Sequence, residues 1–180
     1  MSQVVEVHLP ATFEDLASLR AGDQVVLDGT VYTMRDAGHA RTLEYLREHG
    51  ELPFELEGQT LFYAGPSPAA AGRPLGSVGP TTASRMDFAS PELYGAGITS
   101  SIGKGKRSRA VAEACARTGA VHFTAVGGVA ALLATCVKSA ETVAWPELGT
   151  EALTRLEIEG FPAFVAIDSL GNDVFSTIGR

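Results

Sequence analysis

The second half of the chain alternates strand-like and helix-like segments, and this alternation most constrains its fold. Apolar runs rich in β-branched residues at 98–102 and 121–126 are each followed by a helical pattern, at 107–118 and 129–136. Chains that alternate in this way build a sheet with parallel strands whose faces helices cover. The sequence therefore predicts a mixed α/β fold with a partly parallel sheet.

The first half is rich in turn signals and predicts a hairpin. Residues 24–34 read as two strand pieces that meet at Asp28-Gly29, and Asp-Gly is the strongest short hairpin signal. Further strands are expected at 3–9, 61–64, 75–78, 143–145, 164–167 and 174–178, and a short helix at 91–96.

Two helix starts stand out in the same half. Thr12 with Asp15 comes close to a capping box for a short helix. Asp36 is expected to cap a longer helix that runs to about His49 and stops at Gly50. Because no repeat or linker divides the chain, we expect one domain over residues 1–180, with 1–20 as an N-terminal lead-in.

Composition narrows the classes of function. The 180 residues are 45% apolar and carry a net charge of −7, which fits a globular domain and excludes a global basic footprint for nucleic acid. Cys115 and Cys136 make neither a disulfide framework nor a metal site. The chain shows no signal peptide, and Gly127-Gly128 breaks its longest uncharged run. We therefore expect a cytoplasmic protein without a membrane span.

One segment is locally basic. Lys104, Lys106, Arg107, Arg109 and Arg117 place five of the 14 Lys and Arg residues close together. In an acidic protein such a segment fits a small anionic ligand better than a polyanion. The alternative is the solvated start of a helix.

Polar segments follow several expected strands, where sites in α/β folds usually lie. Arg35 comes directly after the strand that ends near Met34 and could bind a carboxylate through two parallel hydrogen bonds. His39, one helical turn later, could face the same space. The alternative is a structural ion pair of Arg35 and a half-buried histidine.

The segment from Gly79 to Asp87 crowds Thr81, Thr82, Ser84 and Arg85 after a Gly-Pro turn. If a helix starts here, its free backbone N–H groups and Arg85 would point together at an anion. The plainer alternative is a threonine that caps a helix, followed by a surface arginine.

Two glycine-rich segments complete the set. Lys104 lies between Gly103 and Gly105, whose backbones could bend closely around a ligand. The spacing does not match a phosphate-binding P-loop. Gly127-Gly128 separates a strand from a helix and could admit a ligand, or form only a tight turn. Taken alone, these residues indicate a small dicarboxylate or phosphate site that is incomplete for catalysis.

At these same positions the sequence resembles a known family, the β subunits or C-terminal domains of the class I iron–sulfur fumarate hydratases and the related tartrate dehydratases. The resemblance covers roughly residues 20–175. It rests on GD-x-V-x-L-x-G at 22–29, RDAGH at 35–39, YAGP at 63–66, GPTTASRMD at 79–87, IGKG at 102–105, GG-x-AAL at 127–132 and the ending FP…IDSLGN at 161–172.

The resemblance implies a single swivelling β/β/α domain with a mixed sheet, and it implies roles for residues. Arg35, Arg85 and Lys104 would bind the substrate carboxylates. Thr81 would be the hydroxyl base, with Thr82 beside it. His39, Gly79, Gly127 and Gly128 remain further candidates.

The resemblance also implies that half of the enzyme lies elsewhere. In the family a [4Fe–4S] cluster is held by three cysteines of the α subunit or N-terminal domain, and Cys115 and Cys136 match none of them. The chain would thus be the β subunit of a hydro-lyase that interconverts (S)-malate and fumarate, active only with an α subunit. Isolated, it would expose the partner face and could form a homo-oligomer.

Two alternatives stay open. The chain could belong to a dehydratase for tartrate or another hydroxy-dicarboxylate, although the RMD at 85–87 favours fumarate. It could also be a non-catalytic domain that binds small anions.

Overall fold

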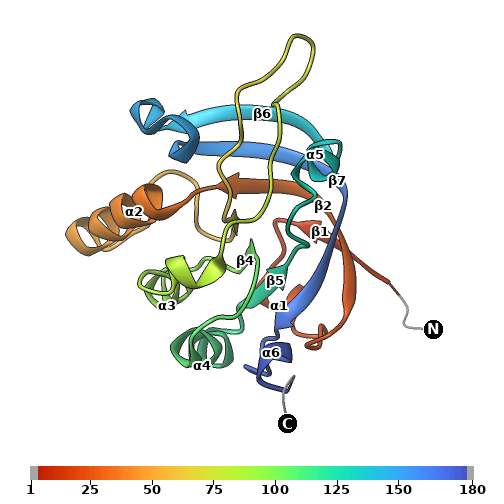
Figure 1. Cartoon of the computed structure of the whole chain (residues 1–180). Coiled ribbons are helices and arrows are strands. Elements are labelled where there is room, and N and C mark those ends of the chain that lie inside the picture. The colour runs from red at the N-terminus through yellow and green to blue at the C-terminus, as the bar shows by residue number, and fades with distance from the viewer. Residues whose placement is uncertain (1–3, 178–180) are drawn as a thin grey trace.

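A computed structural model describes residues 4–177 and shows one mixed sheet of seven strands, which confirms the mixed α/β fold (Figure 1). The strands follow one another across the sheet in the order β1-β2-β3-β4-β5-β7-β6. They are β1 (Val5–Leu9), β2 (Gln24–Thr33), β3 (Thr60–Phe62), β4 (Ser100–Gly103), β5 (Val121–Thr124), β6 (Val137–Ala144) and β7 (Leu153–Ile167). The helices are α1 (Phe13–Leu16), α2 (Asp36–His49), α3 (Ser90–Gly95), α4 (Arg109–Thr118), α5 (Ala130–Ala134) and α6 (Val174–Thr177), with 3-10 helices η1 (Ala83–Met86) and η2 (Pro146–Glu151).

The first five strands are parallel, and β7 closes the sheet partly into a barrel. β1 to β5 pair in sequence, each parallel to the next. The long β7 runs antiparallel to β5, to β2 and to the edge strand β6. Because β7 pairs with both β2 and β5, it ties the two sides of the parallel part together.

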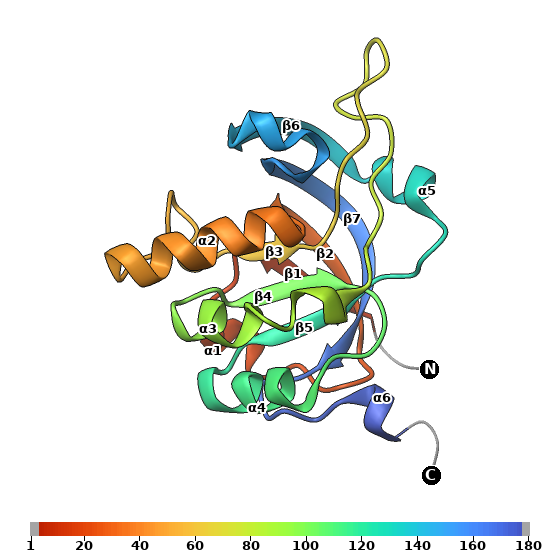
Figure 2. The same cartoon turned by 60° about the vertical axis from the view of Figure 1, so that its left-hand side comes forward.

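Alternate residues of the parallel strands face two different cores, as the period of two in a strand requires. Phe62, Ile102 and Phe123 belong to the core enclosed by the curved sheet. Their sequence neighbours, such as Leu61 and Tyr63 on either side of Phe62, face the layer of α2, α3 and α4, which lies on one side of the sheet (Figure 2). That second core also contains Tyr63 and Cys115.

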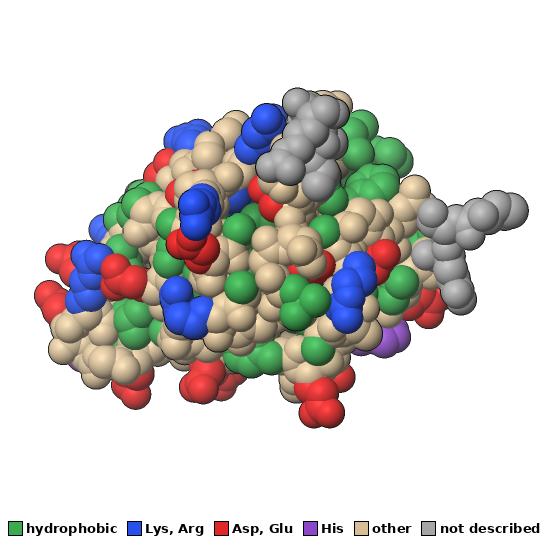
Figure 3. All heavy atoms as spheres, turned by 90° about the horizontal axis from the view of Figure 1, so that it is seen from below, with side chains coloured by type: hydrophobic (Ala, Val, Ile, Leu, Met, Phe, Trp, Pro, Cys, Tyr) green, Lys and Arg blue, Asp and Glu red, His purple; other side chains and the backbone are tan. Residues whose placement is uncertain are grey.

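On the face shown in Figure 3, acidic and basic side chains of the described residues are interspersed. No helix within residues 4–177 is both long enough and apolar enough to cross a membrane.

The predicted hairpin at Asp28-Gly29 is wrong. Residues 24–33 form one strand, β2, and Gly29 pairs with Leu9 of β1 at φ +108°. The Asp28 carboxylate accepts a hydrogen bond from the Gly160 N–H of β7 at 2.7 Å, next to a register shift between Leu27 and Gly29. Because β1 and β7 pair with β2 on both sides here, Asp28-Gly29 forms a bulge within the strand and not a turn.

Other boundaries also differ from expectation. The described residues of 75–78 and 174–177 form no strand, and the latter are helix α6, where the Asp173 side chain accepts from the Phe175 N–H at 2.9 Å. Ile178 lies outside the described residues. The expected strands at 143–145 and 164–167 are the ends of the longer β6 and β7.

Helix starts were predicted with mixed success. The capping box of Thr12 and Asp15 is confirmed. The second helix does run from Asp36 to His49 with Gly50 at its end, but Arg35 is its N-cap residue. Asp36 is not the cap, because its carboxylate bonds to Arg85 instead.

We predict that Gly29→Ala destabilises the fold far more than Gly50→Ala. Both glycines have positive φ, which costs an L-residue about 1–2 kcal/mol. A Cβ on Gly29 would also lie 2.0 Å from the Leu9 carbonyl oxygen, whereas nothing lies within 4 Å of one on Gly50. Urea unfolding should show a loss of about 1–2 kcal/mol for Gly50→Ala and at least about 3 kcal/mol for Gly29→Ala. Equal losses would contradict the close approach of β1.

Candidate functional site

The carboxyl ends of four parallel strands lie at one edge of the sheet and bring the candidate residues together. Thr33 pairs with Phe62, Phe62 with Ile102, and Gly103 with Thr124. Arg35, Lys104 and Gly127 follow β2, β4 and β5 within a few residues. Ligands of parallel sheets usually bind at this edge.

The segment that contains the two threonines lies across the ends of β3 and β4. The Thr81 N–H donates to the Tyr63 carbonyl at 2.7 Å. The Lys104 N–H donates to the Thr81 carbonyl at 3.2 Å, and the Ala83 N–H to the Lys104 carbonyl at 2.8 Å. These backbone bonds place Thr81 and Thr82 beside Lys104.

The hydroxyls of Thr81 and Thr82 have no hydrogen-bond partner among the described residues. Thr82 is the N-cap residue of η1, yet its side chain caps nothing. The interpretation of this threonine pair as a helix cap is therefore wrong. Thr81 is half-buried and Thr82 exposed, so both hydroxyls remain available to a ligand.

Lys104 is half-buried, and no carboxylate of the described residues lies within 4.0 Å of its ammonium. Gly127 packs against its stem, because a Cβ there would lie 3.2 Å from Lys104 Cδ. Gly128 serves the turn, with φ +82° and nothing within 4 Å. Gly79 lies against α5, where a Cβ would be 2.9 Å from that of Ala130.

The two arginines converge on the start of α2, and each meets one carboxylate. Arg85 donates from Nε and Nη2 to the two oxygens of Asp36, at 3.1 and 2.7 Å. Arg35 Nη2 lies 3.7 Å from Glu151 Oε1. Arg35 Nε is buried without a partner among the described residues. The structure thus brings Arg35 and Arg85 to the same edge as Lys104.

Beneath the site lies a buried polar layer. The Arg107 side chain is 1% exposed. It donates to Asp87 Oδ1 at 2.6 Å and to Ser90 Oγ at 2.6 Å, and its guanidinium carbon lies 5.2 Å from the centre of the Tyr63 ring. The interpretation as a solvated helix start is therefore wrong for Arg107, although it holds for Arg109, whose side chain is 91% exposed.

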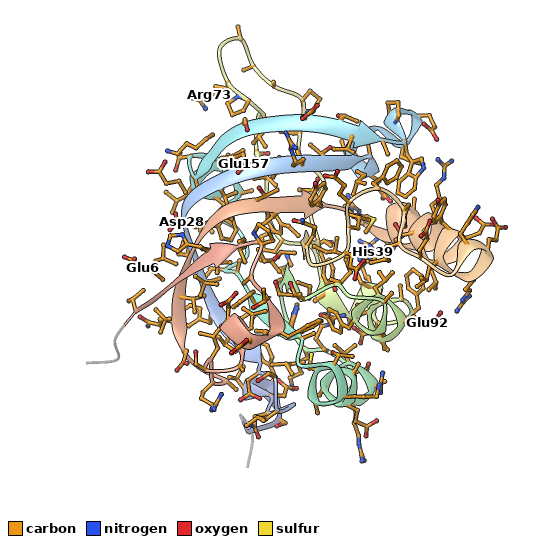
Figure 4. All side chains as sticks on the ribbon, turned by 180° about the vertical axis from the view of Figure 1, so that it is seen from behind. Glu6, Asp28, His39, Arg73, Glu92 and Glu157 are labelled. Atoms are coloured by element: carbon orange, nitrogen blue, oxygen red, sulfur yellow. The ribbon has the colours of Figure 1, made fainter. Side chains whose placement is uncertain are left out.

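His39 supports the site from below and does not open onto it. The side chain is fully buried between α2 and the sheet (Figure 4). Its Nδ1 lies 2.8 Å from the Arg35 carbonyl, and its ring meets Tyr63 edge-on at 5.0 Å. Burial lowers the pKa of His39 to about 4. Burial and the nearby Arg107 likewise hold the pKa of His122 well below its ordinary value. Both rings are thus neutral near pH 7.

The two cysteines are associated with different cores of the fold. Cys115 is buried in the core beneath the helices, and burial raises the pKa of its thiol to about 12. Cys136 packs against the other core. Within residues 4–177 no group of three His, Cys, Asp or Glu side chains is arranged to hold a metal ion.

Sequence reasoning missed the partners of the arginines. The sequence predicts a helix cap at Asp36 and gives no sign of its bond to Arg85. Glu151 lies more than a hundred residues from Arg35 in the sequence, so no local pattern links the two; its carboxylate also accepts a hydrogen bond from the Ala37 N–H. Gly65 was missed as well. A Cβ at Gly65 would lie 2.8 Å from the Thr150 carbonyl oxygen and 3.1 Å from Arg35 Cδ.

We predict that acid weakens the fold already below pH 6.5. A buried histidine with a pKa of about 4 must stay neutral when folded but binds a proton when unfolded below about pH 6.5, so stability is full above this pH and falls towards pH 4. His39 alone should cost about 1 kcal/mol between pH 7.5 and 5.5, and His122 acts in the same direction. Urea unfolding at both pH values measures the loss. An imidazole of His39 that titrates near pH 6.5 by NMR would contradict the prediction.

Comparison with known proteins places the chain in a family. Residues 1–178 match the family model described as the fumarase C-terminus. The anaerobic class I fumarate hydratase of Escherichia coli K12 is 41% identical over 91% of this chain and 30% of its own length. Fumarate hydratase 2 of Leishmania major is 36% identical over 98% of this chain and 34% of its own length. The chain thus spans about a third of these relatives.

A relative of similar length also exists. The L(+)-tartrate dehydratase subunit beta of Escherichia coli K12 is 37% identical over 93% of this chain and 84% of its own length. Since the family model covers nearly every residue, and a relative of matching length shares the whole domain, the chain belongs to the fumarase C-terminus family.

Proposed function

We propose that this chain is the β subunit of a two-subunit hydro-lyase that interconverts (S)-malate and fumarate plus water. The observation that carries the proposal is that Arg35 and Lys104 follow parallel strands at their carboxyl ends, with Thr81 and Thr82 beside Lys104 and Arg85 in the 3-10 helix that comes directly after them. Membership in the fumarase C-terminus family supports it.

The cations would bind and orient the dicarboxylate. Arginine meets a carboxylate through a planar fork, whereas lysine acts as a point charge. Lys104 carries the charge that no described carboxylate offsets at this edge. An anionic ligand could therefore supply the counter-charge of Lys104.

The same cations would favour proton removal. Malate loses a weakly acidic proton from the carbon next to a carboxylate, and negative charge builds on that carboxylate as the proton leaves. Arg35, Arg85 and Lys104 would stabilise this charge more in the transition state than in the ground state. Thr81 would accept the proton, with the nearby Lys104 ammonium favouring its ionised form.

The proposal assigns the [4Fe–4S] cluster to a partner α subunit, as in the family that the sequence resembles, whose cluster ligands Cys115 and Cys136 do not match. Such a cluster supplies the Lewis acid for the departing hydroxyl. This chain would contribute the carboxylate-binding cations and the hydroxyl.

The partner would cover the edge that carries the site. The loop between β3 and η1 projects from the body (Figures 1 and 2), with Arg73 near its tip (Figure 4). Beside Gly127-Gly128, Val126 and Leu132 are 57% and 62% exposed. Exposed apolar side chains next to a polar site are typical of an interaction surface.

A dehydratase for tartrate or another hydroxy-dicarboxylate is the second candidate. The matching length of the tartrate dehydratase subunit beta favours it. Both candidates use the same cations and differ only in the hydroxyls of the substrate.

We predict that the isolated chain is inert and that an α partner restores activity. The chain should be produced alone and together with an α-type partner under anaerobic conditions, and each preparation tested with (S)-malate and with L(+)-tartrate. If the assembled pair turns over (S)-malate and the isolated chain does not, the result supports the proposed function. If the assembled pair turns over L(+)-tartrate but not malate, the result supports the second candidate. Turnover by the isolated chain would contradict the shared site.

We also predict that Thr81→Ala and Thr82→Ala differ sharply in the assembled enzyme. Loss of a general base lowers the rate by a factor of about 10² to 10⁴, and Thr81→Ala should show this loss with folding and assembly intact. Thr82→Ala is the matched control, because the exposed hydroxyl of Thr82 is one residue away. The rate at which the proton on the substrate carbon exchanges with solvent measures the proton-removal step directly. If Thr81→Ala exchanges this proton at the wild-type rate, Thr81 is not the base.

A further inference from the structure

Arg85 is held along one edge of its guanidinium by a single carboxylate. Its Nε and Nη2 donate to Asp36 Oδ1 and Oδ2 at 3.1 and 2.7 Å. This is the parallel two-bond geometry that fixes both the position and the plane of an arginine. The pair joins η1 to the first residue of α2, 49 residues away in the sequence.

The other edge of the same guanidinium is left open. Arginine has five N–H donors in a fixed plane, and the fork to Asp36 uses one from Nε and one from Nη2. No described residue accepts a hydrogen bond from Arg85 Nη1. The side chain is 46% exposed, so the edge formed by Nη1 and the second N–H of Nη2 can meet another carboxylate.

We propose that Asp36 is the positioning residue for Arg85, holding its Nη1–Nη2 edge towards one carboxylate of the ligand. That this carboxylate belongs to a dicarboxylate substrate rests on the proposed function. Asp36 itself need not touch the substrate. Without it, the guanidinium must be ordered anew when the ligand binds, which should weaken binding about 3- to 10-fold.

Two other roles for Asp36 make different predictions. If Asp36 only favours the start of α2 as an anion near a helix N-terminus, its loss should lower stability and leave ligand binding unchanged. If it competes with the ligand for Arg85, its loss should tighten binding. The direction of the change in affinity therefore separates the three roles.

The chain contains a matched control pair. Arg47 and Glu92 form the same fork, with Nε and Nη2 at 3.1 and 2.5 Å from the two carboxylate oxygens. The side chains of Arg47 and Glu92 are 61% and 45% exposed, and the pair joins the last turn of α2 to α3. Glu92→Gln thus removes an equivalent ion pair away from the site.

The first experiment follows the arginine Nε–H signals of the full chain by NMR during titration with succinate, a non-reacting dicarboxylate. The Arg85 signal is assigned with Arg85→Lys. Succinate should shift this signal, and Asp36→Ala should weaken the apparent affinity about 3- to 10-fold, with Asp36→Asn intermediate. Glu92→Gln should bind like the unaltered chain. Unchanged or tighter binding in Asp36→Ala, or no response of Arg85 in the unaltered chain, would overturn the proposal.

The second experiment uses the chain assembled with its α partner. Asp36→Ala should raise KM for malate by a similar factor, whereas Glu92→Gln should leave KM and kcat unchanged. Thermal unfolding of both variants checks that the difference is not one of stability. If no pairing shows hydro-lyase activity, the proposed function fails, while the succinate titration still decides the role of Asp36.

Discussion

The register of the parallel strands β2 to β5 is the constraint on which the candidate site depends. Their last residues pair side by side, so the segments that leave them share one edge. A slip of one residue would turn Phe62, Ile102 and Phe123 out of the enclosed core. β7 secures the register from the other side, because it bonds to both β2 and β5.

The cations at this edge differ in whether a carboxylate offsets their charge. Asp36 and Glu151 each meet one arginine, whereas Lys104 meets no described carboxylate. Deeper in the fold, Arg107 is buried but compensated by Asp87 and by the ring of Tyr63. An isolated buried charge would be very costly, so Arg107 is a structural element. Lys104, whose charge no described carboxylate offsets, is only half-buried and therefore accessible to a ligand.

Much of the candidate site was predictable because residue type and position after a strand are local properties. Arg35, Lys104 and Gly127 could be placed at the ends of expected strands without knowledge of the fold. The sequence left open whether His39 is half-buried and did not indicate the burial of Arg107, since both depend on α2 and α3 packing over the sheet around Tyr63. Glu151 reaches Arg35 from a distant 3-10 helix, and nothing local marks it as a partner.

The sequence by itself determined the alternation of strands and helices, the capping box at Thr12 and the extent of α2, because these follow from periodicity and from side chains that bond to their neighbours in the chain. Only the tertiary structure decided that Asp28-Gly29 lies within a strand and that Asp36 holds Arg85. Local preferences for turn or strand amount to about 1 kcal/mol. Strands β1 and β7, which flank β2 on both sides, supply a ladder of backbone hydrogen bonds that outweighs such a preference.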